Sequence, residues 1–146
     1  MINRFKKLFL VAIFTIFCLT LSACKSYEDL EHVTHSEIFN IQETEYYIYV
    51  YRPNCEVCSN LEETVYKYAK KAKRSDDLPN LYVLNKGDGV NNAGIYCSQE
   101  DYKDFVGATT PSEVKTSTSP YLFKIKNGQV VLTIDDGNIM KEKLTL

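Results

Sequence analysis

Two cysteines separated by two residues are the side chains of this sequence best suited to chemistry. They are Cys55 and Cys58, in the order Cys-Glu-Val-Cys. Two thiols at this spacing can close a small disulfide loop, and at the start of a helix the unpaired backbone amides stabilise a thiolate on the first of them. We therefore expect Cys55, nearer to solvent, to attack or receive a disulfide. Cys58, one turn further in, would resolve the mixed disulfide.

The residues around the pair predict the junction of a strand and a helix. Residues 46–51, Tyr-Tyr-Ile-Tyr-Val-Tyr, have the composition of a fully buried strand, and the Arg-Pro-Asn that follows ends it. From Cys55 to Ala72 apolar residues recur every three or four positions, which predicts an amphipathic helix with Asn54 as its N-cap. A cysteine pair at such a junction is a much more specific signal than its spacing alone.

The middle of the chain predicts a second strand and little further regular structure. The strand is expected over residues 81–84, followed by a glycine-containing loop that leads to Cys97. Ser98 and Asp101 have the spacing that caps a short helix, which we expect to end near Phe105. The stretch between there and Ser119 is rich in Ser and Thr and is expected to be irregular.

A β-hairpin is the clearest local signal in the last third of the chain. Asn127-Gly128 lies between two strand-like runs, residues 121–126 and 129–134. A short helix over residues 139–144 would follow it. The order strand, helix, strand, helix, hairpin, helix predicts an α/β fold with a central mixed sheet flanked by helices.

Ser119 and Pro120 stand immediately before the first strand of that hairpin. With the cysteine pair upstream, the run Ser-Pro-Tyr-Leu-Phe-Lys-Ile-Lys-Asn-Gly-Gln-Val-Val resembles the thioredoxin superfamily, over roughly residues 46–134. The resemblance implies the thioredoxin fold and thiol–disulfide exchange with no metal or other cofactor. It also implies a cis Pro120 packed beside the cysteines, and a backbone at Ser119 that pairs with the extended chain of a substrate.

Two positions depart from the pattern of thioredoxin itself. Thioredoxin usually has a tryptophan just before the first cysteine, where this chain has Asn54 and no tryptophan anywhere. It also has a buried aspartate six residues before that cysteine, as proton acceptor for the resolving thiol, where this chain has Tyr49. That role would then pass to Glu56 or to a water molecule.

The first two dozen residues predict export and lipidation. Three basic side chains in residues 1–7 precede an almost continuous apolar run, as in a secretory signal peptide; an uncleaved membrane anchor is the alternative. Leu-Ser-Ala-Cys, ending at Cys24, resembles the lipobox of bacterial lipoproteins, which implies cleavage before Cys24 and acylation of its thiol. We expect a signal peptide over residues 1–23, a lipidated N-terminus, polar tether and start of the domain over 24–45, and a thioredoxin-like domain over 46–146.

This organisation predicts where the protein works and what it meets. It would act outside the cytoplasm, anchored by its lipid to the bacterial cell membrane, where disulfides persist. Its partners would be thiols or disulfides of exported or membrane proteins, and a membrane protein that recharges the pair. A formal net charge of −2 provides no basic patch of the size that nucleic-acid binding demands. The direction of electron flow stays open, because oxidant, reductant and isomerase share this framework.

Other interpretations of the same residues remain open. His32 and His35 could join the cysteine pair as a tetrahedral zinc set, although solvated surface histidines explain them as well. Cys97 is a third redox thiol, a partner in an alternative disulfide or a small buried hydrophobe, and its neighbours Ile95 and Tyr96 favour the last. The whole domain could also be a non-catalytic thioredoxin-fold accessory module, for example in bacteriocin export.

Overall fold

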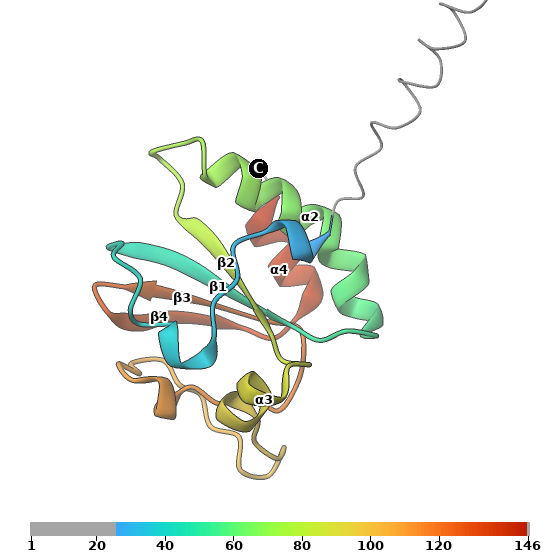
Figure 1. Ribbon diagram of the computed structural model, residues 1–146, viewed down its shortest axis with the longest axis vertical. Coiled ribbons are helices and arrows are strands. Elements are labelled where there is room, and N and C mark those ends of the chain that lie inside the picture. Colours follow the sequence, from blue (N-terminus) through green and yellow to red (C-terminus); the bar gives the residue numbers. More distant parts are fainter. Residues whose placement is uncertain (1–25, 146) are drawn as a thin grey trace, which may run out of the picture.

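A mixed sheet organises the computed structural model, which describes residues 26–145. Its strand order is β2-β1-β3-β4, as Figure 1 shows. The predicted buried strand is β1 (Glu45–Tyr51), which pairs in parallel with β2 (Asn80–Asn85) and antiparallel with β3 (Tyr121–Lys126). The other edge is β4 (Gln129–Ile134), antiparallel to β3. The prediction of a central mixed sheet flanked by helices is confirmed.

The sheet has a hydrophobic core on each face, because side chains of a strand alternate between faces. Helices α2 (Glu56–Ala72) and α4 (Gly137–Leu144) cover one face, where Tyr47, Tyr49 and Tyr51 of β1 point (Figure 1). The intervening residues of β1 point to the other face, which α3 (Gly89–Ile95) and the loops before β3 cover. Both faces of β1 are thereby buried along its length as far as Tyr51, after which the chain leads to the cysteine pair.

The hairpin and the terminal helix form as predicted. Asn127 and Gly128 adopt φ values of 51° and 74°, the left-handed conformation that a two-residue turn between these strands requires and that Asn and Gly tolerate. Asp136 caps α4 through its carboxylate, which accepts the backbone N–H groups of Asn138 and Ile139. The helix therefore begins two residues before the predicted start.

The region between β2 and β3 differs from the prediction. A helix, α3, occupies part of the expected glycine-containing loop, because Asp88 caps its first turn and Asn91 accepts a hydrogen bond from the backbone N–H of His35 at 2.9 Å. The helix expected from Ser98 to Phe105 is wrong. The hydroxyl of Ser98 does accept the backbone N–H of Asp101 at 3.1 Å and donates to its carboxylate at 2.6 Å, but the chain there makes a turn and continues without a helix.

The segment expected to be a polar tether is folded onto the domain. Residues Tyr27–Asp29 form a 3₁₀ turn, η1, in which Tyr27 is only 5% exposed. Further along, the carbonyl of Glu31 accepts the N–H of Val83 and so covers the free edge of β2. Cys24 and the predicted signal peptide lie outside the described residues. Within residues 26–145, no helix has the length and apolar character to span a membrane.

Candidate functional site

The cysteine pair lies where β1 passes into α2. The connecting turn needs a left-handed residue, and Asn54 supplies it with a φ of 59°. Because Asn54 is used in this way, the predicted N-cap is wrong, and Cys55 takes that position instead. Its Sγ accepts the backbone N–H of Cys58 at 3.2 Å. A sulfur atom thus occupies the place where a helix normally receives a capping oxygen.

Cys55 and Cys58 are joined in a disulfide. Cys58 is 1% exposed and packs in the core beneath α2, whereas Cys55 is half-buried. A thiol that approaches from solvent therefore meets the sulfur of Cys55 first.

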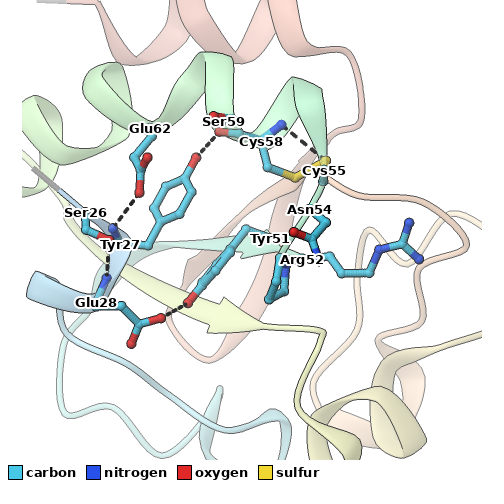
Figure 2. A pocket seen from close by; sticks show the side chains of 11 residues that line it. Ser26, Tyr27, Glu28, Tyr51, Arg52, Asn54, Cys55, Cys58, Ser59 and Glu62 are labelled. Atoms are coloured by element: carbon cyan, nitrogen blue, oxygen red, sulfur yellow. Dashed lines mark hydrogen bonds between the residues drawn. A yellow bond between two sulfur atoms is a disulfide. The ribbon is translucent and has the colours of Figure 1, made fainter.

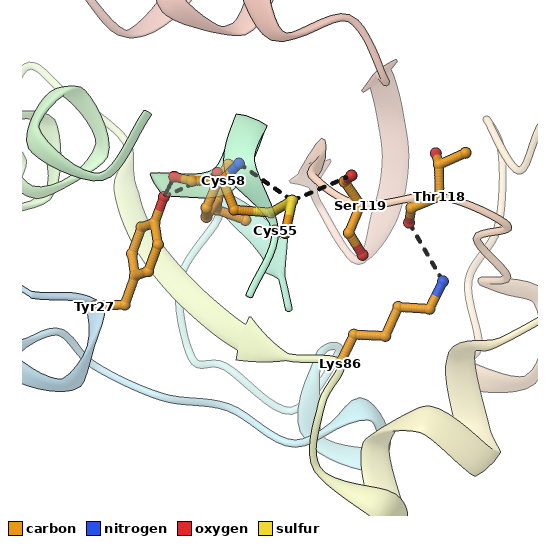
Figure 3. The surroundings of a disulfide bond; sticks show 7 residues. Tyr27, Cys55, Cys58, Lys86, Thr118 and Ser119 are labelled. Atoms are coloured by element: carbon orange, nitrogen blue, oxygen red, sulfur yellow. Dashed lines mark hydrogen bonds between the residues drawn. A yellow bond between two sulfur atoms is a disulfide. The ribbon is translucent and has the colours of Figure 1, made fainter. Parts of the chain in front are cut away.

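The Ser119–Pro120 junction comes from a distant part of the chain to the same place. Its peptide bond is cis, and Pro120 is buried. The carbonyl oxygen of Ser119 lies 3.6 Å from Sγ of Cys55 (Figure 3). The structure thus brings together the four residues that the sequence singled out for the site.

Two tyrosines, which no motif in the sequence marks, form a hydrogen-bonded network beneath the cysteine pair. The phenol of Tyr27 donates to the carbonyl oxygen of Cys58 (Figure 2). Its oxygen also lies 3.0 Å from the phenol oxygen of Tyr49. Burial raises the pKa of both tyrosines, so both are neutral at physiological pH. At the position where the resemblance to thioredoxin implies a buried carboxylate, Tyr49 therefore has a neutral phenol. The one feature of the sequence that indicates a buried residue here is an aromatic side chain, Tyr27, in a mainly polar segment.

A pocket of about 230 Å³ opens beside the disulfide (Figure 2). Its acidic lining residues are Glu28 and Glu62. Glu56, which with a water molecule was one of the two expected proton acceptors, is not among them. Glu62 accepts the backbone N–H of Tyr27 at 3.0 Å, and Glu28 accepts the hydroxyl of Tyr51 at 3.4 Å. The folded N-terminal segment therefore forms one wall of the site.

A buried lysine, which likewise has no motif to mark it in the sequence, fixes the loop that leads to Ser119. Lys86 follows β2, and its ammonium donates to the carbonyl and hydroxyl oxygens of Thr116 at 2.8 and 3.1 Å. It also donates to the carbonyl of Thr118 at 3.3 Å (Figure 3). Cys97 is a free, half-buried thiol whose backbone N–H bonds to Thr116 in the same loop.

The two histidines serve the fold at separate places. His32 lies against the ring of Tyr51 and near the carbonyl of Tyr27, with Nε2 at 3.1 Å. His35 is buried beside α3, with Nε2 3.2 Å from the carbonyl of Val114, and burial lowers its pKa. In the part of the chain that the structure describes, no group of three or more His, Cys, Asp or Glu side chains is placed to hold a metal ion.

No family model and no curated protein matches the sequence. Among solved structures, mitochondrial thioredoxin 3 from Saccharomyces cerevisiae, in its oxidised form, is similar at 14% identity and a TM-score of 0.52, over 81% of this chain and 95% of that one. Thioredoxin f2 from Chlamydomonas reinhardtii is similar at 13% identity and a TM-score of 0.52, over 78% of this chain and 90% of that one. A chain from a structural study of thiol resolution in yeast mitochondrial 1-Cys peroxiredoxin is similar at 15% identity and a TM-score of 0.53. The match covers 82% of this chain and 96% of that one. The chain therefore has the thioredoxin fold, with its Cys55–Cys58 disulfide at the N-terminus of α2.

Proposed function

We propose that this protein is a thiol–disulfide oxidoreductase that exchanges disulfides with exported or membrane proteins. The observation that carries the proposal is the place of the Cys55 sulfur. It is half-buried, it caps a 17-residue helix and it receives the backbone N–H of Cys58. When the disulfide opens, the same N–H and the positive end of the helix stabilise a thiolate on Cys55.

The exchange needs two thiolate attacks and no cofactor. A client thiolate attacks Sγ of Cys55, a client–Cys55 disulfide forms, and Cys58 leaves as a thiolate. A second client thiolate then attacks the client sulfur of that mixed disulfide. The client is oxidised, and the electron pair stays on Cys55, so the protein ends with two reduced cysteines. The reverse sequence reduces a client. In both directions the backbone at Ser119, beside Cys55, holds the client chain.

The proposal predicts a reversible two-electron couple at this pair. The full chain in a mild detergent would be equilibrated in thiol buffers of graded potential, alkylated and measured by mass. We expect one transition that Cys97→Ser leaves unchanged. A midpoint between about −120 and −180 mV would indicate that it oxidises clients, and one near about −270 mV that it reduces them. A disulfide that never opens and closes reversibly would contradict catalysis and favour a non-catalytic accessory module.

We also propose that the protein is a lipoprotein, anchored outside the cytoplasm through Cys24. The support is the basic N-terminus, the apolar run and the Leu-Ser-Ala-Cys motif of the sequence. We expect cells fed a labelled fatty acid to label the chain, and Cys24→Ser to lose the label and retain the uncleaved signal. Cys18→Ser, which alters a cysteine inside the predicted signal peptide, is the control and should be labelled normally. Label that persists in Cys24→Ser would contradict this anchor.

A further inference from the structure

The topology of the sheet places two basic residues side by side next to the disulfide. Strands β1 and β2 run parallel, with their last residues, Tyr51 and Asn85, in register. Arg52 and Lys86 are the residues that follow, and the backbone N–H of Lys86 donates to the carbonyl of Tyr51 at 2.7 Å. Carboxyl ends of neighbouring parallel strands are where open α/β sheets usually bind ligands.

A pocket of about 200 Å³ lies between these two side chains and the loop that leads to Pro120. We call it the cationic pocket. Arg52, Lys86, Asn92, Tyr96 and residues 117–119 line it, and none of them is acidic. Ser119 is shared between this pocket and the disulfide, because its carbonyl oxygen lies 3.6 Å from Sγ of Cys55.

In the part of the chain that the structure describes, neither cation of the cationic pocket is paired with an acidic side chain. Lys86 is only 4% exposed, and its ammonium donates to uncharged oxygens and lies 5.2 Å from the centre of the Tyr96 ring. None of the ion pairs recorded within residues 26–145 involves Lys86 or Arg52. Burial lowers the pKa of Lys86, the neighbouring Cys97 opposes this, and the positive charge of Arg52 lowers it further.

An uncompensated pair of cations in a partly enclosed pocket favours an anion. Arg52 is exposed and also lines the pocket of about 230 Å³ beside Tyr27, but in Figure 2 its guanidinium points away from Glu28 and Glu62. A guanidinium can hold a carboxylate through two parallel hydrogen bonds, whereas the donors of Lys86 are already used within the protein. Arg52 would form the hydrogen bonds to the bound anion, and the charge of Lys86 would add to the positive electrostatic potential of the pocket.

We propose that the cationic pocket binds an acidic side chain of the client polypeptide, located one or two residues from the client cysteine that reacts with Cys55. The inference rests on the proposed exchange function. A residue next to a cysteine lies about 3.8 Å from it along the chain, so a client held at Ser119 and joined to Cys55 brings its neighbouring side chain to this pocket. The pocket would thereby select clients by the charge next to their cysteine.

The test compares peptides that differ only in that charge. The full chain carrying Cys58→Ser, in a mild detergent, would react with cysteine peptides activated as small-thiol disulfides, with Glu, Gln or Lys beside the cysteine. We expect the Glu peptide to form the mixed disulfide about fivefold faster than its Gln partner at low salt, and the Lys peptide to be slowest. In 1 M salt, where the screening length is about 3 Å, the preference should shrink.

Matched arginine variants assign the preference to the pocket. Arg52→Gln should bring the Glu-to-Gln rate ratio to about one, and Arg74→Gln, an exposed arginine beyond the end of α2, should leave it near fivefold. Comparing ratios removes the effect that the neighbouring charge has on the peptide's own sulfur. A ratio near one in the chain with Arg52, or a ratio that survives Arg52→Gln, would overturn the inference and leave the exchange function intact.

A second measurement separates the pocket from the chemistry. A peptide with Ser in place of the cysteine and Glu beside it cannot exchange disulfides, so it reports binding alone. Titrated onto the full chain, it should shift the NMR signal of the Arg52 Nε–H group, and the Gln version should not. If this shift is seen but none of the cysteine peptides forms a mixed disulfide, the proposed exchange function is refuted and binding at the cationic pocket is supported. Without a shift, the pocket inference fails even if exchange proceeds.

Discussion

Replacing Cys58 by serine should trap clients on the protein. In cells that express Cys58→Ser we expect covalent adducts through Cys55 to accumulate, because the thiol that would release the client is gone. Cys58 is attached to the same helix turn as Cys55, and an intramolecular thiol outcompetes thiols in solution by a large factor. The lifetime of a mixed disulfide should therefore lengthen by about a hundredfold or more. Acid quenching, alkylation and a non-reducing gel followed by mass spectrometry would identify the adducts.

Two further variants decide which sulfur carries the client. Cys55→Ser leaves only Cys58 of the pair, which is 1% exposed, so few adducts should form. Cys58→Ser combined with Cys97→Ser should retain the adducts, because Cys97 is not part of the disulfide. If Cys55→Ser traps clients and Cys58→Ser does not, the proposed roles are reversed. If neither traps any, at normal expression, exchange with proteins is refuted.

Truncating Tyr27 should destabilise the domain strongly. Tyr27 is 5% exposed, and its ring centre lies 5.4 and 4.5 Å from those of Tyr49 and Tyr51. Its hydroxyl donates a hydrogen bond to the carbonyl of Cys58. Tyr27→Ala removes these contacts and leaves a cavity under the disulfide. We expect the free energy of unfolding to fall by about 3–5 kcal/mol. Tyr27→Phe, which keeps the ring and loses the hydroxyl, should cost about 1 kcal/mol.

Denaturant unfolding of the full chain in a non-ionic detergent, followed by near-ultraviolet circular dichroism, would measure both changes. The signal is available because the chain has 11 tyrosines and no tryptophan. Tyr66→Ala is the matched control, since Tyr66 lies half-buried on α2 and contacts the ammonium of Lys70. It should cost less than about 1 kcal/mol. A loss as small as this for Tyr27→Ala would mean that the segment before His32 does not unfold together with the rest of the domain.

The elements predicted from the sequence are those whose signal is local. The strand over residues 46–51 is marked by composition, helix α2 by its apolar spacing, and the hairpin by Asn127-Gly128. Helix α3 has no such mark, because glycines stand near both its ends, and its burial depends on contacts with the segment around His35. Ser98 shows the opposite case, in which a capping pair forms without the helix that it predicted.

The candidate site divides in the same way. The cysteine pair and Ser119-Pro120 could be recognised because each stands at a strand end in a known pattern. Tyr27 and Lys86 could not, since their partners Cys58 and Thr116 lie 31 and 30 residues away in the chain. The N-cap predicted at Asn54 lies one position before the observed one. Asn favours caps but also tolerates positive φ, and the turn uses the second property.

The burial of Tyr27 limits how far the domain can lie from the predicted lipid anchor at Cys24. From Cys24 to Tyr27 the chain spans at most about 11 Å, and Tyr27 donates a hydrogen bond to the carbonyl of Cys58, the residue proposed to resolve the exchange. An acylated Cys24 would therefore hold the disulfide close to the bilayer surface, without a spacer that lets the domain swing outward. A protein anchored in this way would search for its clients in two dimensions. It would meet cysteines of membrane proteins, or of chains still emerging from the membrane, far more often than those of proteins that have already diffused away.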